Sequence, residues 1–307
     1  MQTLDSKSFE RARNYLRTHA RPLDRALFLH QFEGAPAGPV GRALEAYRNE
    51  DGGFGRALEP DFRLPDSSAM ATCIGLRILH EIGAPGDDPL VRGAIRYLCE
   101  TYDPERPGWI DVPAQVNDHP HAPWWQRDDS ARLGPEDVWG NPEAEIVARF
   151  HTWPEQVPAA LLAEVSDLTL SRLDHTPSPL PPYVALCYQR LGETAPPEVR
   201  GRIAGRLRSD ARKILDPDPA GWDGNAFPLF WLVPTPDTPG ADQLEAEVAL
   251  ELDREIARQG EDGAWEPRWS WMGGYPEAWE VARREWRGEQ TLHTLRALRA
   301  WGRIEGL

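Results

Sequence analysis

The first candidates for chemistry are three acidic residues that follow a glycine-rich turn near the start of the chain. They are Glu59, Asp61 and Asp66. A carboxyl group that projects beside apolar walls has a raised pKa, which suits proton donation to an alkene or to a leaving group. We therefore predict these residues as catalytic acids. For Asp66 a second interpretation stays open, because it precedes a predicted helix and could cap the free backbone N–H groups there.

Tryptophan is abundant, with 13 residues in the chain, and two groups of it lie beside irregular segments. Trp124 and Trp125 are adjacent, and Trp269 and Trp271 lie in the most aromatic part of the sequence. An aromatic wall can stabilise a carbocation through cation–π contact or stack against a sugar ring. The same side chains can also simply fill a core. We predict these four residues as substrate-binding residues.

A pair of histidines offers a weaker candidate for a metal site. His119 and His121 have Asp118, Asp128 and Asp129 nearby, and this combination could hold a divalent metal. A His-x-His pair in a loop is more often packed against aromatic residues or exposed on the surface, so we assign no metal ligand. The sequence contains no Cys-x-x-Cys motif or Cys/His cluster of the kind that binds structural zinc. No cofactor is assigned.

The elements that must position these residues are helices. Apolar residues recur at helical spacing through most of the chain, and strand-like alternation is nearly absent. Two long stretches, 103–141 and 216–239, are irregular and rich in aromatic residues. We expect these stretches and the loop 260–280 to meet around one cavity. The predicted helices are 7–19, 22–33, 38–49, 67–82, 89–102, 142–151, 158–174, 180–191, 197–215, 241–259, 276–286 and 289–303.

An internal repeat links the two ends of the chain. The segment 49–54 reads NEDGGF and the segment 260–265 reads GEDGAW, and each follows one predicted helix and precedes another. Glycine after an acidic residue allows a tight turn with positive φ, after which the aromatic side chain folds back between helix ends. Asp51 and Asp262 are therefore predicted to be structural turn residues. A repeated helix pair is typical of a solenoid or a closed ring.

The longer segments around these turns resemble the Q-x-x-D-G-x-(F/W) motifs of the terpenoid cyclase and protein prenyltransferase superfamily. Gln259, Gly263 and Trp265 match the Gln, Gly and aromatic residue of the repeat, whereas the first copy has Arg48 where Gln is usual. The overall sequence pattern resembles that of bacterial prenyltransferase-like and squalene-cyclase-like proteins. The resemblance implies an all-α fold, an (α/α)6 toroid of helical hairpins with a central cavity, and a single domain over residues 1–307.

The resemblance also implies an isoprenoid-handling enzyme of the cyclase or prenyltransferase type. The acid motif D-x-D-D and the zinc motif D-x-C are absent, and neither Asp87-Asp88 nor Asp128-Asp129 continues into D-D-x-x-D. The mechanism is therefore unassigned. Two alternatives stay open: a non-catalytic toroid that serves as a scaffold or binds a ligand, and a carbohydrate-active hydrolase or lyase with two carboxylates and tryptophan platforms.

Charge and composition restrict the partners. The formal net charge is -15, and an acidic surface repels the phosphates of nucleic acids and anionic lipids, so neither is an expected partner. A small hydrophobic ligand is compatible with the aromatic content. We find no membrane-spanning run and no secretion signal, and predict a cytoplasmic protein. The three cysteines, Cys73, Cys99 and Cys187, are predicted to be reduced and buried.

Overall fold

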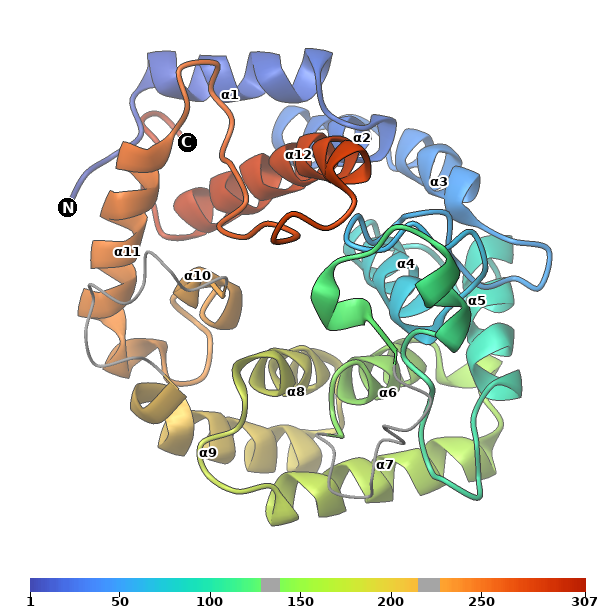
Figure 1. Ribbon diagram of the computed structural model, residues 1–307. Helices are drawn as coiled ribbons and strands as arrows, with labels where there is room; N and C mark the ends of the chain where they lie inside the picture. Colours follow the sequence, from blue (N-terminus) through green and yellow to red (C-terminus); the bar gives the residue numbers. More distant parts are fainter. Residues whose placement is uncertain (128–138, 215–226) are drawn as a thin grey trace. The chain divides into compact units, whose positions relative to one another are not determined.

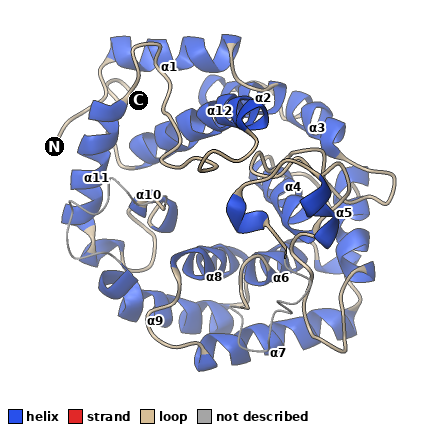
Figure 2. Cartoon of the chain, in the orientation of Figure 1, coloured by secondary structure: helices blue, strands red, loops and turns tan. Residues whose placement is uncertain are grey.

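The fold is all-helical in the computed structural model, which describes residues 1–127, 139–214 and 227–307. Within these ranges the only β-type pairing consists of isolated bridges between loop residues, and Figure 2 shows helices joined by loops. The α-helices, labelled as in Figure 1, are α1 (Ser6–Thr18), α2 (Pro22–Glu33), α3 (Gly38–Leu44), α4 (Ala69–Glu81), α5 (Pro89–Glu100), α6 (Glu143–Thr152), α7 (Ala159–His175), α8 (Pro182–Thr194), α9 (Pro197–Ile214), α10 (Leu229–Leu232), α11 (Glu245–Arg258) and α12 (Pro276–Ala300).

The helices expected from apolar periodicity are found, with bounds that differ by a few residues and with two larger differences. The predicted helices 276–286 and 289–303 form one continuous helix, α12. Gly288 lies inside it because a side chain there has no room: an added Cβ would come within 3.0 Å of the Ala20 Cβ and 3.1 Å of the Asp24 Oδ2. Glycine thus allows α12 to pack closely against α2. The second difference is α10, a short helix inside a stretch that was expected to be irregular.

The chain folds as two compact units. The first unit contains Met1–Ala43, Gly205–Ser270 and Pro276–Leu307, and the second contains Leu44–Ala204 together with Trp271–Tyr275. In the first unit α12 packs against α1 and α2, and α10 packs against α11. In the second unit α6 packs between α4 and α8, α5 packs against α4, and α7 packs against α6.

The first copy of the repeat forms a turn and an aromatic plug in the second unit. The Asp51 Oδ1 accepts hydrogen bonds from the backbone N–H of Gly53 (2.9 Å) and from the Ser67 hydroxyl (2.8 Å). Phe54 is fully buried, and its backbone N–H donates to the Thr72 Oγ1 of α4 (2.9 Å). Gly52 has φ +93° and lies directly against the backbone of α5. The turn therefore packs against both α4 and α5.

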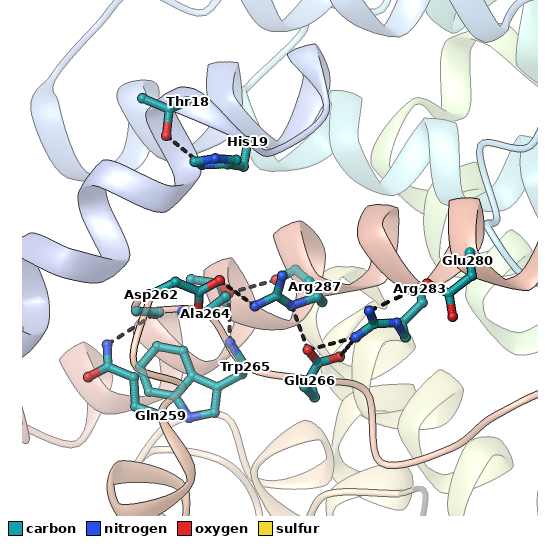
Figure 3. A network of polar contacts seen from close by, with 12 residues as sticks. Thr18, His19, Gln259, Asp262, Ala264, Trp265, Glu266, Glu280, Arg283 and Arg287 are labelled. Carbon is teal, nitrogen blue, oxygen red and sulfur yellow. Dashed lines mark hydrogen bonds and ion pairs between the residues drawn. The ribbon is translucent and has the colours of Figure 1, made fainter.

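The second copy repeats the backbone contacts in the first unit (Figure 3). The backbone N–H of Ala264 donates to the Asp262 Oδ1 (3.2 Å), and Gly263 has φ +92°. The backbone N–H of Trp265 donates to the Thr291 Oγ1 of α12 (3.1 Å). Gly263 lies against the backbone of α1, as Gly52 lies against α5. The predicted structural turn role of Asp262, and of its counterpart in the first copy, is confirmed.

All three cysteines are free; Cys73 and Cys187 are buried, as expected, but Cys99 is partly exposed, so its predicted burial is wrong. Cys99 is the second-last residue of α5, where one side of the helix faces solvent. Among the helices that the structure describes, none combines the length and the apolar character needed to cross a membrane.

Candidate functional site

The candidate site is built around Asp61, in the second unit. The loop that contains it pairs with a second loop: the backbone N–H of Ala122 donates to the Asp61 carbonyl (2.7 Å), and that of Arg63 donates to the Pro120 carbonyl (2.8 Å). An antiparallel bridge joins Phe62 to His121 between these bonds. Two loops without regular structure are thereby fixed to one another, and Asp61 is only 3% exposed.

Trp271 fixes the Asp61 carboxylate from a distant part of the chain. Its indole Nε1 donates to the Asp61 Oδ1 over 2.7 Å, and both side chains are buried. The two residues are 210 positions apart in sequence. Trp271 begins the short segment Trp271–Tyr275, which belongs to the second unit although its neighbours on both sides belong to the first.

Backbone strain concentrates in these same two segments. Within the residues that the structure describes, four non-glycine residues have positive φ: Arg56 (54°), Ala57 (59°), Met272 (50°) and Tyr275 (45°). Two lie just before Asp61 in sequence, and the other two lie just after Trp271. A left-handed conformation at a residue with a Cβ is unfavourable and persists only where the surroundings impose it. Such strain clusters at active sites and ligand clamps.

The paired loops and the Trp271–Tyr275 segment also bring aromatic side chains together. The His121 and Tyr275 rings lie 5.5 Å apart, and the Phe62 and Trp125 rings meet edge to face at 5.2 Å. The helix α8 contributes Tyr183: burial of its hydroxyl, followed by the negative charges of Glu59 and Asp61, raises the pKa of this phenol to about 12. Tyr183 as a whole is 44% exposed. The site therefore combines carboxylates with an aromatic rim that solvent can reach.

The predicted acids have different positions. Asp61 is central, and the Glu59 Oε1 accepts a long hydrogen bond (3.4 Å) from the Asp61 backbone N–H. Asp66 is exposed. Its interpretation as a helix cap is wrong, because the Ser68 hydroxyl accepts from the Ala71 backbone N–H (3.1 Å) and caps α4. Serine two residues later has the extended backbone that a capping position requires.

The predicted aromatic wall is divided between the two units. Trp271 and Trp125 belong to the Asp61 site. Trp124 is adjacent to Trp125 in sequence, and 46% of its surface is exposed. Trp269 belongs to the first unit, where its ring packs edge to face against Trp286 (4.9 Å) and Trp231 (6.2 Å). Trp269 and Trp271 are only two positions apart in sequence, but they belong to different units. Part of the loop 260–280 therefore belongs to each unit.

The histidine pair is used inside its own loop. The His121 Nδ1 lies 2.6 Å from the His119 carbonyl, and the Nε2 lies 2.9 Å from the Gln126 Oε1. Both ring nitrogens thus have protein partners. Within the described residues no group of three or more His, Cys, Asp and Glu side chains is placed to hold a metal. Asp128 and Asp129, the nearby acids weighed as ligands, lie outside the described residues.

Sequence reasoning missed Tyr183 and Tyr275 as members of the site. Tyr183 lies in the first turn of α8, and nothing in its local sequence distinguishes it from a residue that packs in the core. Tyr275 follows two glycines, which indicates a tight turn but not what the turn contacts. No protein-family model matches this chain, and a search of curated proteins by sequence gives no match.

Proposed function

We propose that this chain is an isoprenoid-handling enzyme of the terpene cyclase or prenyltransferase type. In this proposal its helix pairs close into an (α/α)6 toroid, and Asp61 is the catalytic carboxylate. One observation carries the proposal: a buried aspartate is held by the indole N–H of Trp271, on loops whose backbone is strained on both sides of the contact. The resemblance of the two glycine-rich turns to the repeats of that superfamily supplies the substrate class.

The chemistry follows from the surroundings of the carboxylate. Reactions of isoprenoid chains pass through carbocations, which an aromatic face stabilises through its quadrupole. A carboxylate fixed among aromatic rings adds a directed negative charge, and it needs no reorganisation when positive charge develops. The hydrogen bond from Trp271 fixes the orientation of Asp61, so Trp271 is a positioning residue in this proposal. Tyr183, which faces the same carboxylates, presents its exposed ring to an arriving substrate.

A second candidate is a binding protein that uses the same site without chemistry. It is favoured by the absence of the D-x-D-D, D-D-x-x-D and D-x-C motifs from the sequence. Both candidates predict that a hydrophobic ligand binds beside Asp61, so ligand binding and product formation must be measured separately.

The test uses Asp61→Asn, because the asparagine carbonyl can still accept the Trp271 N–H while the negative charge is removed. The matched control is Asp87→Asn, an exposed aspartate in the same unit. Intrinsic tryptophan fluorescence is titrated with farnesyl diphosphate, geranylgeranyl diphosphate, squalene and, as a contrast, cellohexaose. Products of extended incubations, with and without Mg²⁺, are then analysed by mass spectrometry.

We expect binding of an isoprenoid, product formation by the wild type and the control, and at least a hundredfold loss of turnover in Asp61→Asn. The melting temperature should be nearly unchanged in both variants. Binding without turnover in the wild type would favour the binding protein. Saturable binding of cellohexaose, without binding of any isoprenoid, would contradict both candidates. It would favour a carbohydrate-active protein.

A further inference from the structure

A second polar cluster lies inside the second unit, where α4, α6 and α8 pack together. Its centre is Glu145 of α6, which is 3% exposed. The Glu145 Oε2 accepts a hydrogen bond from the Arg190 Nη1 of α8 at 2.5 Å, and the Arg77 Nη1 of α4 lies 3.4 Å from the same oxygen. One buried carboxylate thus joins arginines from the two helices that flank its own.

Glu145 carries the negative charge at the centre of this cluster. Burial alone would raise the pKa of Glu145, but the guanidinium groups of Arg190, Arg77 and Arg149 outweigh it and lower the pKa to about 2. Glu145 is therefore ionised at neutral pH and carries one negative charge among three arginines. The nearby Cys73 thiol stays neutral, since burial raises its pKa well above the ordinary value.

Arg149 is the arginine of this cluster whose buried N–H donors are incompletely paired. It lies one helical turn after Glu145 on α6 and is 1% exposed, and its Nε and Nη1 have no hydrogen-bond partner within the residues that the structure describes. The carboxylate of Glu193 on α8 is close enough to influence Arg149, but it accepts instead from the Gln189 Nε2 (2.8 Å), and Glu193 is exposed to solvent. Buried donors, and buried charges above all, normally have partners.

We propose that Arg149, together with Arg77 and Arg190, forms an internal binding site for a small monovalent anion of the size of chloride. The anion accepts hydrogen bonds from the Nε and Nη1 of Arg149, which have no acceptor among the residues that the structure describes. A small ion is specified because Arg149 is almost completely enclosed, whereas the Arg77 and Arg190 side chains, each 18% exposed, provide the route from solvent. The site does not depend on the function proposed for Asp61.

The experiment measures anion-dependent stability. The full-length protein is dialysed into chloride-free sodium gluconate and then titrated with sodium chloride, bromide or phosphate at constant ionic strength, while the melting temperature is followed. The site predicts a saturable rise of about 3–5 °C when chloride reaches a hundred times its Kd, because an ion that binds only the folded state stabilises it. Line broadening in ³⁵Cl NMR reports the bound ion directly, and an excess of bromide should reverse it.

Three variants test the assignment. Arg149→Met should abolish the chloride-dependent rise and the NMR broadening, and Arg92→Met, an exposed arginine in the same unit, should retain both. Glu145→Gln removes the negative carboxylate that competes with the anion for the arginine side chains, and it should tighten chloride binding at least threefold. It serves as the decisive variant if Arg149→Met does not fold.

Equal melting curves in chloride and gluconate, an unchanged response in Arg149→Met, or weaker binding in Glu145→Gln would each overturn the proposal. Stabilisation by phosphate but not by chloride would overturn the assignment to a small monovalent anion.

Discussion

The two glycine-rich turns allow a test of the repeat by a single methyl group. In Gly52→Ala the new Cβ would lie 2.7 Å from the Gly93 carbonyl oxygen, and in Gly263→Ala it would lie 2.3 Å from the carbonyl carbon of Arg11. Both distances are shorter than non-bonded contacts allow, and the opposing atoms are helix backbone that cannot rotate away. The turn must therefore move off its helix in either variant.

The magnitude has two parts. Alanine at positive φ costs about 1 kcal/mol at either position. Displacing the turn also loosens the Phe54 plug: losing half of its burial costs about 1–1.5 kcal/mol, and weakening its hydrogen bond to Thr72 costs about 1 kcal/mol. We therefore expect Gly52→Ala to lower the free energy of unfolding by about 3 kcal/mol. Gly263→Ala should cost a similar amount through Trp265.

The matched controls have the same left-handed backbone and open space. Gly83→Ala belongs to the unit of Gly52 and Gly34→Ala to that of Gly263; their φ values are +66° and +68°, and no atom lies within 4 Å of the added Cβ. Each control should cost only about 1 kcal/mol. Urea unfolding, followed by circular dichroism and by tryptophan fluorescence, measures all four variants. If a turn variant costs no more than its control, the turn is not packed against its helix as described, and the reasoning fails.

Three further predictions concern single groups. Burial raises the pKa of Glu143 to about 7 from an ordinary value of 4.5. The folded state therefore binds the Glu143 carboxyl proton more tightly than the unfolded chain does. The resulting stabilisation of the fold is complete below pH 4.5 and is lost as the pH rises through about 7. Urea titrations at several pH values should show a loss of about 2 kcal/mol in the free energy of unfolding, after allowance for partial exposure of Glu143. The loss should be absent in Glu143→Gln. Thr72→Val should cost about 1–3 kcal/mol, because a buried backbone N–H loses its acceptor; a neutral result in urea unfolding would contradict that bond. In the native protein Cys99 should react with a thiol reagent before Cys73 and Cys187. Its reaction should be slow, since burial raises the pKa of the Cys99 thiol to about 11. Simultaneous reaction of all three cysteines would show that the buried pair is accessible.

The helices and the repeated turns could be predicted from the sequence because both depend on neighbouring residues. Apolar spacing and helix-starting prolines indicated α2 from Pro22 to Glu33 with its bounds correct. The acidic residue before glycine specified the turns at Asp51 and Asp262, where side chain and backbone interact two positions apart. Interactions over so few positions can be recognised from a short segment of the sequence.

The contacts of the candidate site depend on the tertiary structure. Asp61 was identified as a candidate acid, but its bond to Trp271 joins residues 210 positions apart, and no local pattern specifies which of the tryptophans reaches it. Trp269, two positions earlier, packs in another unit. The continuity of α12 through Gly288 was decided by packing against α2, which outweighs the weak helix propensity of glycine. The arginine cluster around Glu145 likewise exists only because three helices bring their arginines to one carboxylate. The sequence alone records each residue type without its neighbours in space.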